Sequence, residues 1–205
     1  GSAYYEQGNT KALVAIHGPR EVHRGKGKRE GVIINCVYKM APFSTGERRR
    51  TTGKLDRRET EISLVIKRTF ETAILTELAP YSQLDINIQI LQADGGTRCA
   101  AINATTLALI DAGIPIKDFV VSCAAGYIDG TPILDLNYLE DASNSPDLPV
   151  ALMPKTNKIS MIQMDSRLHI DTFEQVLTLA CEGCSKIYKI MSTAVSAHTK
   201  ALYTK

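Results

Sequence analysis

A strand that runs into two glycines and then a helix is the clearest pattern along the chain. Apolar residues occupy every second position from 84 to 90, which is the period of a half-buried strand. After Gly95 and Gly96, apolar residues recur at helical spacing as far as Gly113 and Pro115, a usual helix ending. The helical positions are Ala100, Ala101, Ala104, Leu107, Ala108 and Ile110. We therefore predict the order strand, Gly-Gly turn, helix.

This turn has the chemistry of an anion site. Glycine lets the backbone approach an anion closely, and the free N–H groups of a new helix carry a partial positive charge. Gly96, Thr97 and Arg98 would supply amide, hydroxyl and guanidinium donors. The segment is not a Walker loop, because no Lys-Ser/Thr pair follows, and it lacks the spacing of a dinucleotide fingerprint. An ordinary tight turn is the alternative.

A second helix is predicted to begin after Asp56, which suits the N-cap position and has Glu59 three residues later. Its apolar face continues at helical spacing to Pro80 through Ile62, Val65, Ile66, Phe70, Ala73, Ile74 and Leu78. Arg58 would lie in the first turn, where a cation opposes the helix dipole. A bound anion would explain this arginine, although a solvated side chain is the alternative.

Two aspartates lie downstream on a predicted loop. Residues 127–137 read as a hairpin around Asp129 and Gly130, and turn-forming residues 142–146 then separate Asp141 from Asp147. Two neighbouring carboxylates suit a divalent cation, or one of them can act as a general acid. An acidic surface turn is the alternative.

Length and composition favour one domain over residues 1–205. The order of the predicted strands and helices suits an α/β fold in two layers, with a mixed β-sheet packed against helices. The chain has 205 residues and 44% hydrophobic content, and a last long helix is predicted from Asp171. No apolar run reaches membrane-spanning length and no secretory signal is visible, so we expect an intracellular protein without a membrane partner. The five cysteines, including the pair Cys181 and Cys184, are predicted to be reduced core residues.

Charge is distributed unevenly. The net charge is +2, but residues 20–58 hold twelve Lys or Arg against four acids. This local excess favours a polyanion, while solvated loops are the alternative. The chain has no Trp, and aromatic residues are scarce in the basic stretch. We therefore expect contacts to a nucleic-acid backbone, with base stacking in a lesser role.

Several longer stretches resemble one enzyme family. They are residues 1–3 with 6–11, 43–48, 91–98, 111–115, 134–137 with 140–141, and 163–165. Over essentially the whole chain the sequence resembles the RNase PH family of phosphate-dependent 3′-to-5′ exoribonucleases, and most closely the active-type ring subunits of the archaeal and eukaryotic exosome. The resemblance implies the RNase PH fold. It also implies that an N-terminal family segment is missing here.

The resemblance assigns roles to the candidate residues. Arg58 and Arg98, with Gly96 and Thr97, would bind inorganic phosphate as the co-substrate. Asp141 and Asp147 would be catalytic and would hold Mg²⁺, and the product would be a nucleoside diphosphate. Arg48, Arg49 and Arg57 would bind RNA.

The resemblance also implies partners and location. A second RNase PH-type subunit would complete a hetero-hexameric ring, with S1/KH-type cap proteins and RNA bound to it. A eukaryotic protein of this type would act in the nucleus, nucleolus and cytoplasm, in rRNA processing and RNA degradation. Two alternatives remain open: a catalytically silent scaffold and RNA-channel subunit of the exosome core, and a stand-alone RNase PH that trims tRNA ends.

Overall fold

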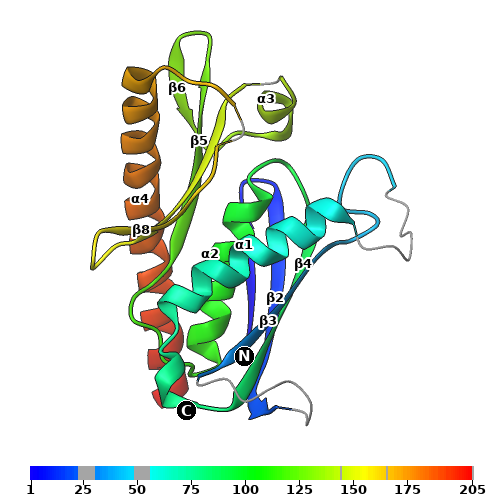
Figure 1. Ribbon diagram of the computed structural model, residues 1–205, viewed down its shortest axis with the longest axis vertical. Coiled ribbons are helices and arrows are strands. Elements are labelled where there is room, and N and C mark those ends of the chain that lie inside the picture. The colour runs from blue at the N-terminus through cyan, green and yellow to red at the C-terminus, as the bar shows by residue number, and fades with distance from the viewer. Residues whose placement is uncertain (23–30, 49–55, 144, 165, 205) are drawn as a thin grey trace.

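The computed structural model describes residues 1–22, 31–48, 56–143, 145–164 and 166–204, and Figure 1 shows their arrangement. The first sheet has the strand order β1-β2-β4-β3. Its strands are β1 (Ser2–Gln7), β2 (Thr10–Glu21), β3 (Ile33–Met40) and β4 (Ser82–Gln92). β3 runs parallel to β4, and the other neighbours are antiparallel, so the sheet is mixed as predicted.

Two helices cover one face of this sheet. Helix α1 (Arg57–Ala73) packs on β3, and α2 (Thr97–Asp111) packs on β1 and β2. The apolar residues of β4 that alternate along the strand, Leu84, Ile86, Ile88 and Ile90, all lie in the shared core beneath them. The predicted period of two therefore identified the buried face of β4.

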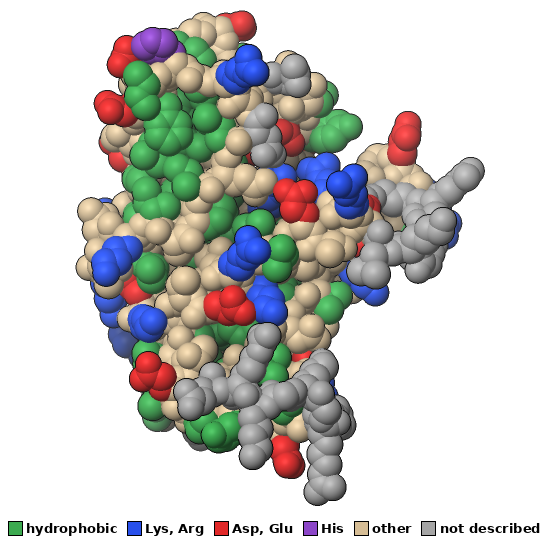
Figure 2. Space-filling view, viewed as in Figure 1, with side chains coloured by type: hydrophobic (Ala, Val, Ile, Leu, Met, Phe, Trp, Pro, Cys, Tyr) green, Lys and Arg blue, Asp and Glu red, His purple; other side chains and the backbone are tan. Residues whose placement is uncertain are grey.

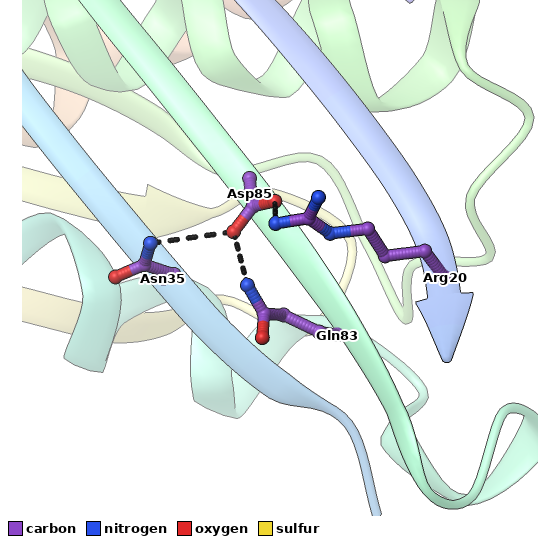
Figure 3. A network of polar contacts seen from close by, with 4 residues as sticks. All are labelled: Arg20, Asn35, Gln83 and Asp85. Carbon is purple, nitrogen blue, oxygen red and sulfur yellow. Dashed lines mark hydrogen bonds and ion pairs between the residues drawn. The ribbon is translucent and has the colours of Figure 1, made fainter. Parts of the chain in front are cut away.

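The opposite face of the first sheet carries a polar network around Asp85 (Figure 3). The Asp85 carboxylate accepts hydrogen bonds from Asn35 Nδ2 at 3.3 Å and Gln83 Nε2 at 2.6 Å, and it pairs with the Arg20 guanidinium. A carboxylate so little exposed needs such partners to offset its desolvation. The network ties β2, β3 and β4 together at one end of the sheet.

The second sheet is antiparallel, with the order β6-β5-β7-β8. Its strands are β5 (Val121–Ile128), β6 (Thr131–Leu134), β7 (Asp147–Met153) and β8 (Lys158–Ile162). Helix α4 (Ile170–Tyr203) covers one face and runs along the length of the molecule in Figure 1. The short helix α3 (Tyr138–Ala142) lies between β6 and β7. No helix in the described ranges is both long and apolar enough to cross a membrane.

Helix α2 lies between the two sheets and joins them. It contacts β1 and β2 on one side and β5 and β7 on the other, and Cys99–Thr106 is buried without a break. Its buried Asn103 side chain donates to the Ser122 carbonyl at 2.9 Å and accepts from the Ser122 amide at 2.7 Å. A helix enclosed on both sides has no face turned to solvent. This position explains why the apolar residues of α2 are dense and do not form a single stripe.

The predicted α/β class, with mixed strand pairing and helices packed against sheet, is confirmed. The described strands form two sheets, a division that strand periodicity alone does not reveal. One helix boundary was predicted wrongly: α1 ends at Ala73 and does not continue to Pro80. Ile74 is extended and pairs with Ile116, and a short 3₁₀ helix η1 (Thr76–Leu78) follows.

The prediction that the cysteines are reduced core residues is confirmed for three of the five, while Cys36 and Cys181 are only partly buried. All five are free thiols, and Cys99, Cys123 and Cys184 are buried. Burial raises the pKa of the Cys123 and Cys184 thiols to about 12. These thiols therefore stay protonated at neutral pH, which suits packing and disfavours nucleophilic or redox chemistry.

Candidate active site

Arg58 stands at the N-terminal end of α1. The Asp56 carboxylate caps this helix by accepting a hydrogen bond from the Arg58 amide at 3.0 Å, so the predicted N-cap is confirmed. The Arg58 side chain is exposed at the helix end, where the backbone amides also carry partial positive charge. This end of α1 therefore concentrates positive charge.

The glycine turn brings a second helix end to the same place. Gly95 and Gly96 both have positive φ, 80° and 55°, and Gly96 is the N-cap of α2 in a left-handed conformation. Gly96 has no side chain that could cap the helix, so no N-cap side chain occupies the first-turn amides. Thr97 and Arg98 are the first two residues of α2. The arrangement has the geometry of an anion site at a helix start.

The carboxylates come from the second half of the chain. A capping box holds the start of α3: the Asn137 side chain accepts from the Glu140 amide at 2.9 Å, and Glu140 Oε2 accepts from the Asn137 amide at 2.8 Å. Asp141 follows within this short helix. Asp147 is the first residue of β7, where it pairs in register with Gly126. Both aspartates are thus anchored on regular elements, and the prediction that they lie on a loop was wrong.

The two helix ends and the two carboxylates line one cleft of about 640 Å³. Its walls include Arg58, Gly96, Thr97, Arg98, Asp141 and Asp147. Figure 2 shows basic and acidic side chains gathered beneath α3, beside the N-terminal end of α1. Arg58 and Asp147, which lie 89 positions apart in sequence, therefore meet in one cleft at the junction of the two halves.

A second, larger cleft of about 1220 Å³ adjoins the first. The two share the lining residues Arg58, Gly96, Thr97 and Asp141, so they are immediate neighbours. Arg48, predicted to bind RNA, lines the larger cleft. Arg57 is exposed next to Arg58, and Arg49 lies outside the described residues.

Two residues of the smaller cleft escaped sequence reasoning. Ser166 and Arg167, which follow β8, line the cleft together with Arg58 and Arg98. Ser166 Oγ is buried and has no hydrogen-bond partner within the described part of the chain. A third guanidinium and an open hydroxyl would help to hold a second phosphate group. Their only sequence signal is position, directly after the resembling stretch 163–165.

Asp94 links the glycine turn to α3. Its Oδ1 accepts from the Tyr138 amide at 3.2 Å, and its Oδ2 accepts from Asn9 Nδ2 at 2.8 Å. Its own amide donates to Thr10 Oγ1 at 3.0 Å, and that hydroxyl donates to the Gly95 carbonyl at 2.7 Å. The Asp94 carboxylate therefore holds the glycine turn, which presents the α2 amides, in position relative to α3, which carries Asp141.

A second polar link lies beside it. Gln7 Nε2 on β1 donates to Asp135 Oδ1 at 2.7 Å, across the junction between the halves. Burial, more than the neighbouring Glu140 charge, raises the pKa of the Asp135 carboxyl, while the Gln7 hydrogen bond opposes this rise. Asp135 also has a positive φ of 61°. The junction thus carries backbone strain and a carboxylate whose ionisation is disfavoured.

Comparison with known proteins identifies the family. The chain matches the 3′ exoribonuclease family, RNase PH type, with domain 1 over residues 1–115 and domain 2 over residues 118–183. It belongs to this family, as the resemblance predicted. Both arginines fall in domain 1, and both aspartates fall in domain 2.

Particular relatives are exosome subunits. The chain is 53% identical over 204 residues to the exosome complex component RRP41 homolog of Arabidopsis thaliana, covering 98% of this chain and 84% of that protein. It is 46% identical over 190 residues to exosome complex component Rrp41 of Methanopyrus kandleri, covering 92% and 79%. The crystal structure of rice Rrp46 superposes with a TM-score of 0.84 at 25% identity, covering 96% and 88%.

Proposed function

We propose that this chain is a catalytic ring subunit of an RNA exosome core, a phosphate-dependent 3′-to-5′ exoribonuclease that releases nucleoside diphosphates. The observation that carries the proposal is the single cleft that combines Arg58 and Arg98, the capless start of α2, and the carboxylates of Asp141 and Asp147. Family membership and RRP41 relatives on either side of the archaeal and eukaryotic divide support it.

Inorganic phosphate is the anion that this cleft would hold. Arg58 and Arg98 would contact it from two helix ends, with the Thr97 hydroxyl and first-turn amides of α2 completing the shell. One guanidinium group can donate two parallel hydrogen bonds to phosphate oxygens, and each charge-assisted contact is worth roughly 1.5–3 kcal/mol. These groups also offset the repulsion between the attacking phosphate and the phosphodiester of the RNA.

The reaction is a displacement at the last phosphodiester. An oxygen of the bound phosphate forms a bond to the phosphorus of the terminal nucleotide, and the bond from that phosphorus to the 3′ oxygen of the preceding nucleotide breaks. Asp141 or Asp147 would protonate the leaving 3′ oxygen, which then ends the shortened RNA as a hydroxyl. The released product keeps two phosphorus atoms and is a nucleoside diphosphate.

The same carboxylates fit a bound Mg²⁺. This ion prefers oxygen ligands and is often held by one or two carboxylates together with substrate phosphates. Asp141 and Asp147 supply that number, and no cluster of three or more His, Cys, Asp or Glu side chains suited to a metal occurs in the described ranges. When bound, Mg²⁺ would neutralise charge on the phosphate oxygens.

We further propose that the chain works in a hetero-hexameric ring with a second RNase PH-type subunit, S1/KH-type cap proteins and RNA. The exosome names of the relatives and the fold shared with rice Rrp46 support the ring. In a eukaryotic cell this assembly would act in the nucleus, nucleolus and cytoplasm, in rRNA processing and RNA degradation. Arg48, Arg49 and Arg57 would contact the RNA backbone near the cleft.

One experiment tests the function. The ring is reconstituted with its second RNase PH-type subunit, without hydrolytic nucleases, and end-labelled RNA is supplied with and without phosphate. Phosphate-dependent release of nucleoside diphosphates, resolved by chromatography, is the expected result. Intact RNA under both conditions, in a ring of correct mass, would instead favour the scaffold alternative. Activity of the purified chain without a partner would favour a stand-alone RNase PH.

A further inference from the structure

The larger cleft has features that a simple polyanion groove does not need. Among its described lining residues, Lys11, Arg48 and Arg58 are matched by Glu47, Asp94 and Asp141. Lys11 is also paired with Glu6 at 3.6 Å. Because these opposite charges balance, attraction to RNA phosphates alone does not account for this surface.

Two aromatic side chains stand exposed on its walls. Phe43 is 71% exposed and Tyr138 is 59% exposed, and both line the cleft. Tyr138 is the first residue of α3 and precedes Asp141 by three positions, so the two lie one turn apart on the same side of the helix. An exposed aromatic beside a predicted catalytic carboxylate is placed to contact a substrate near its reacting end.

A buried hydroxyl supplies an independent sign of a ligand. Ser44 is 3% exposed and lines the same cleft, yet its Oγ has no hydrogen-bond partner within the residues that the structure describes. A buried polar group without a partner is costly and calls for an explanation. A ligand in the cleft that accepts or donates one hydrogen bond would satisfy it.

We propose that this cleft binds the bases of the RNA segment just upstream of the scissile bond, with Tyr138 and Phe43 as stacking surfaces and Ser44 as a hydrogen-bonding group. The inference rests on the proposed function, because it treats RNA as the substrate. A volume of about 1220 Å³ exceeds the roughly 300–1,000 Å³ of typical small-molecule sites, so several nucleotide groups fit. Stacking accepts any base, which suits a nuclease without sequence preference.

The inference revises one expectation drawn from composition. The scarcity of aromatic residues in the basic stretch 20–58 argued against stacking as a main contact. The fold brings Tyr138, from far outside that stretch, to the same cleft as Phe43. Two aromatic side chains in the right place are sufficient for local base contacts, whatever the overall aromatic content.

The test compares ordinary RNA with RNA that lacks the bases of the nucleotides just before the last one, which lie upstream of the scissile bond. Affinities for the assembled ring are measured without phosphate, so that no turnover occurs. Stacking of a base on an aromatic side chain is strong enough that removing the side chain weakens RNA binding by roughly 5-fold or more. We expect Tyr138→Ala to weaken binding of ordinary RNA by about this factor, and Tyr138→Phe to restore it. Removing the bases should then lower the RNA affinity of the wild-type ring clearly more than it lowers the RNA affinity of the Tyr138→Ala ring.

Controls separate the inference from its alternatives. Tyr203→Ala removes a tyrosine that is 87% exposed at the far end of α4, and it should leave RNA affinity unchanged. If base removal weakens both proteins equally, Tyr138 does not stack on RNA and the inference fails. Failure of Tyr138→Ala to assemble, measured by mass, would instead mark Tyr138 as a subunit contact and also overturn it. A wild-type ring that releases no nucleoside diphosphate refutes the proposed function, while the affinity comparison still decides this inference.

Discussion

The first half of the molecule contributes the arginine pair of the predicted site and the second half contributes the aspartate pair, and they hold these residues in different ways. Residues 1–115 present Arg58 and Arg98 at the starts of two long helices, α1 and α2, which are packed on the first sheet. Residues 118–183 present Asp141 on the short helix α3 and Asp147 at a strand start. The helices that carry the arginines pack on the first sheet, and α2 also contacts β5 and β7 of the second sheet. The position of α3 depends on contacts across the junction, which makes that junction part of the site.

The largest expected effect comes from the carboxylate half. Asp147→Asn, or Asp141→Asn, removes a group that can protonate the leaving oxygen while keeping the side-chain shape. General acid catalysis contributes roughly 10²–10⁴-fold, so kcat should fall within this range. The KM for phosphate should change little, because both arginines remain. Steady-state assays of the ring at varied phosphate concentration give both values, and a rise in phosphate KM with unchanged kcat would assign the aspartate to phosphate binding instead.

The cation half should respond differently. Arg98→Ala removes a guanidinium beside the phosphate, and loss of such a group typically costs roughly 10²–10³-fold in rate. Phosphorolysis should be lost while RNA binding, measured by filter retention, is kept. Arg68→Ala, an exposed arginine on α1 that lines neither cleft, is the matched control. Equal loss of activity and RNA retention in Arg98→Ala would contradict separate roles for the two halves.

The junction itself can be tested at Gly95. A Cβ atom there would collide with the Leu136 carbonyl oxygen and lie 2.9 Å from the Asn137 carbonyl carbon, so Gly95→Ala must displace the residues before α3. A displacement of about 1 Å can cost on the order of 10²-fold in rate. Gly130→Ala has nearly the same φ, 82° against 80°, but open space, so it tests backbone strain alone. Similar activity in the two variants would show that the contact with Leu136 is unimportant.

The smallest effect concerns Asp135. Its pKa is raised in the folded protein above the ordinary value of 3.8, so ionisation is less favourable folded than unfolded. The protonated Asp135 side chain therefore stabilises the folded protein fully at pH values below 3.8. This stabilisation is lost as the pH rises through the pKa of Asp135 in the folded protein. Asp135→Asn cannot ionise, so the variant should gain stability relative to wild type between acidic and neutral pH. Urea unfolding at several pH values measures this, and parallel profiles would exclude the effect.

Local patterns predicted the elements that carry the site but not their meeting point. The alternation along β4, the glycines before α2 and the Asp56 cap all follow from short-range chemistry, and each was predicted from sequence. The convergence of Arg58 with Asp147 depends on sheet order and on α2 lying between two sheets, which no local period encodes. Asp94, Ser166 and Arg167 were missed for the same reason, because the residues that they meet in the site come from distant parts of the sequence.

The prediction of one domain over residues 1–205 remains a proposal. Ala151 and Met161 of the second sheet share a buried core with the first sheet and both of its helices. The junction is thus apolar as well as polar. We propose that the halves unfold together, in one transition whose midpoint is the same by circular dichroism and by fluorescence.

The capless start of α2 has a thermodynamic consequence. Its first-turn amides lack a side-chain cap, and an oxyanion that binds only the folded chain adds RT ln(1 + [L]/Kd) to stability. Dissolved phosphate would then be a stabiliser as well as a reactant. Melting temperatures taken in phosphate and in other buffers would describe different liganded species, and the slope between them would report affinity for the co-substrate without any RNA.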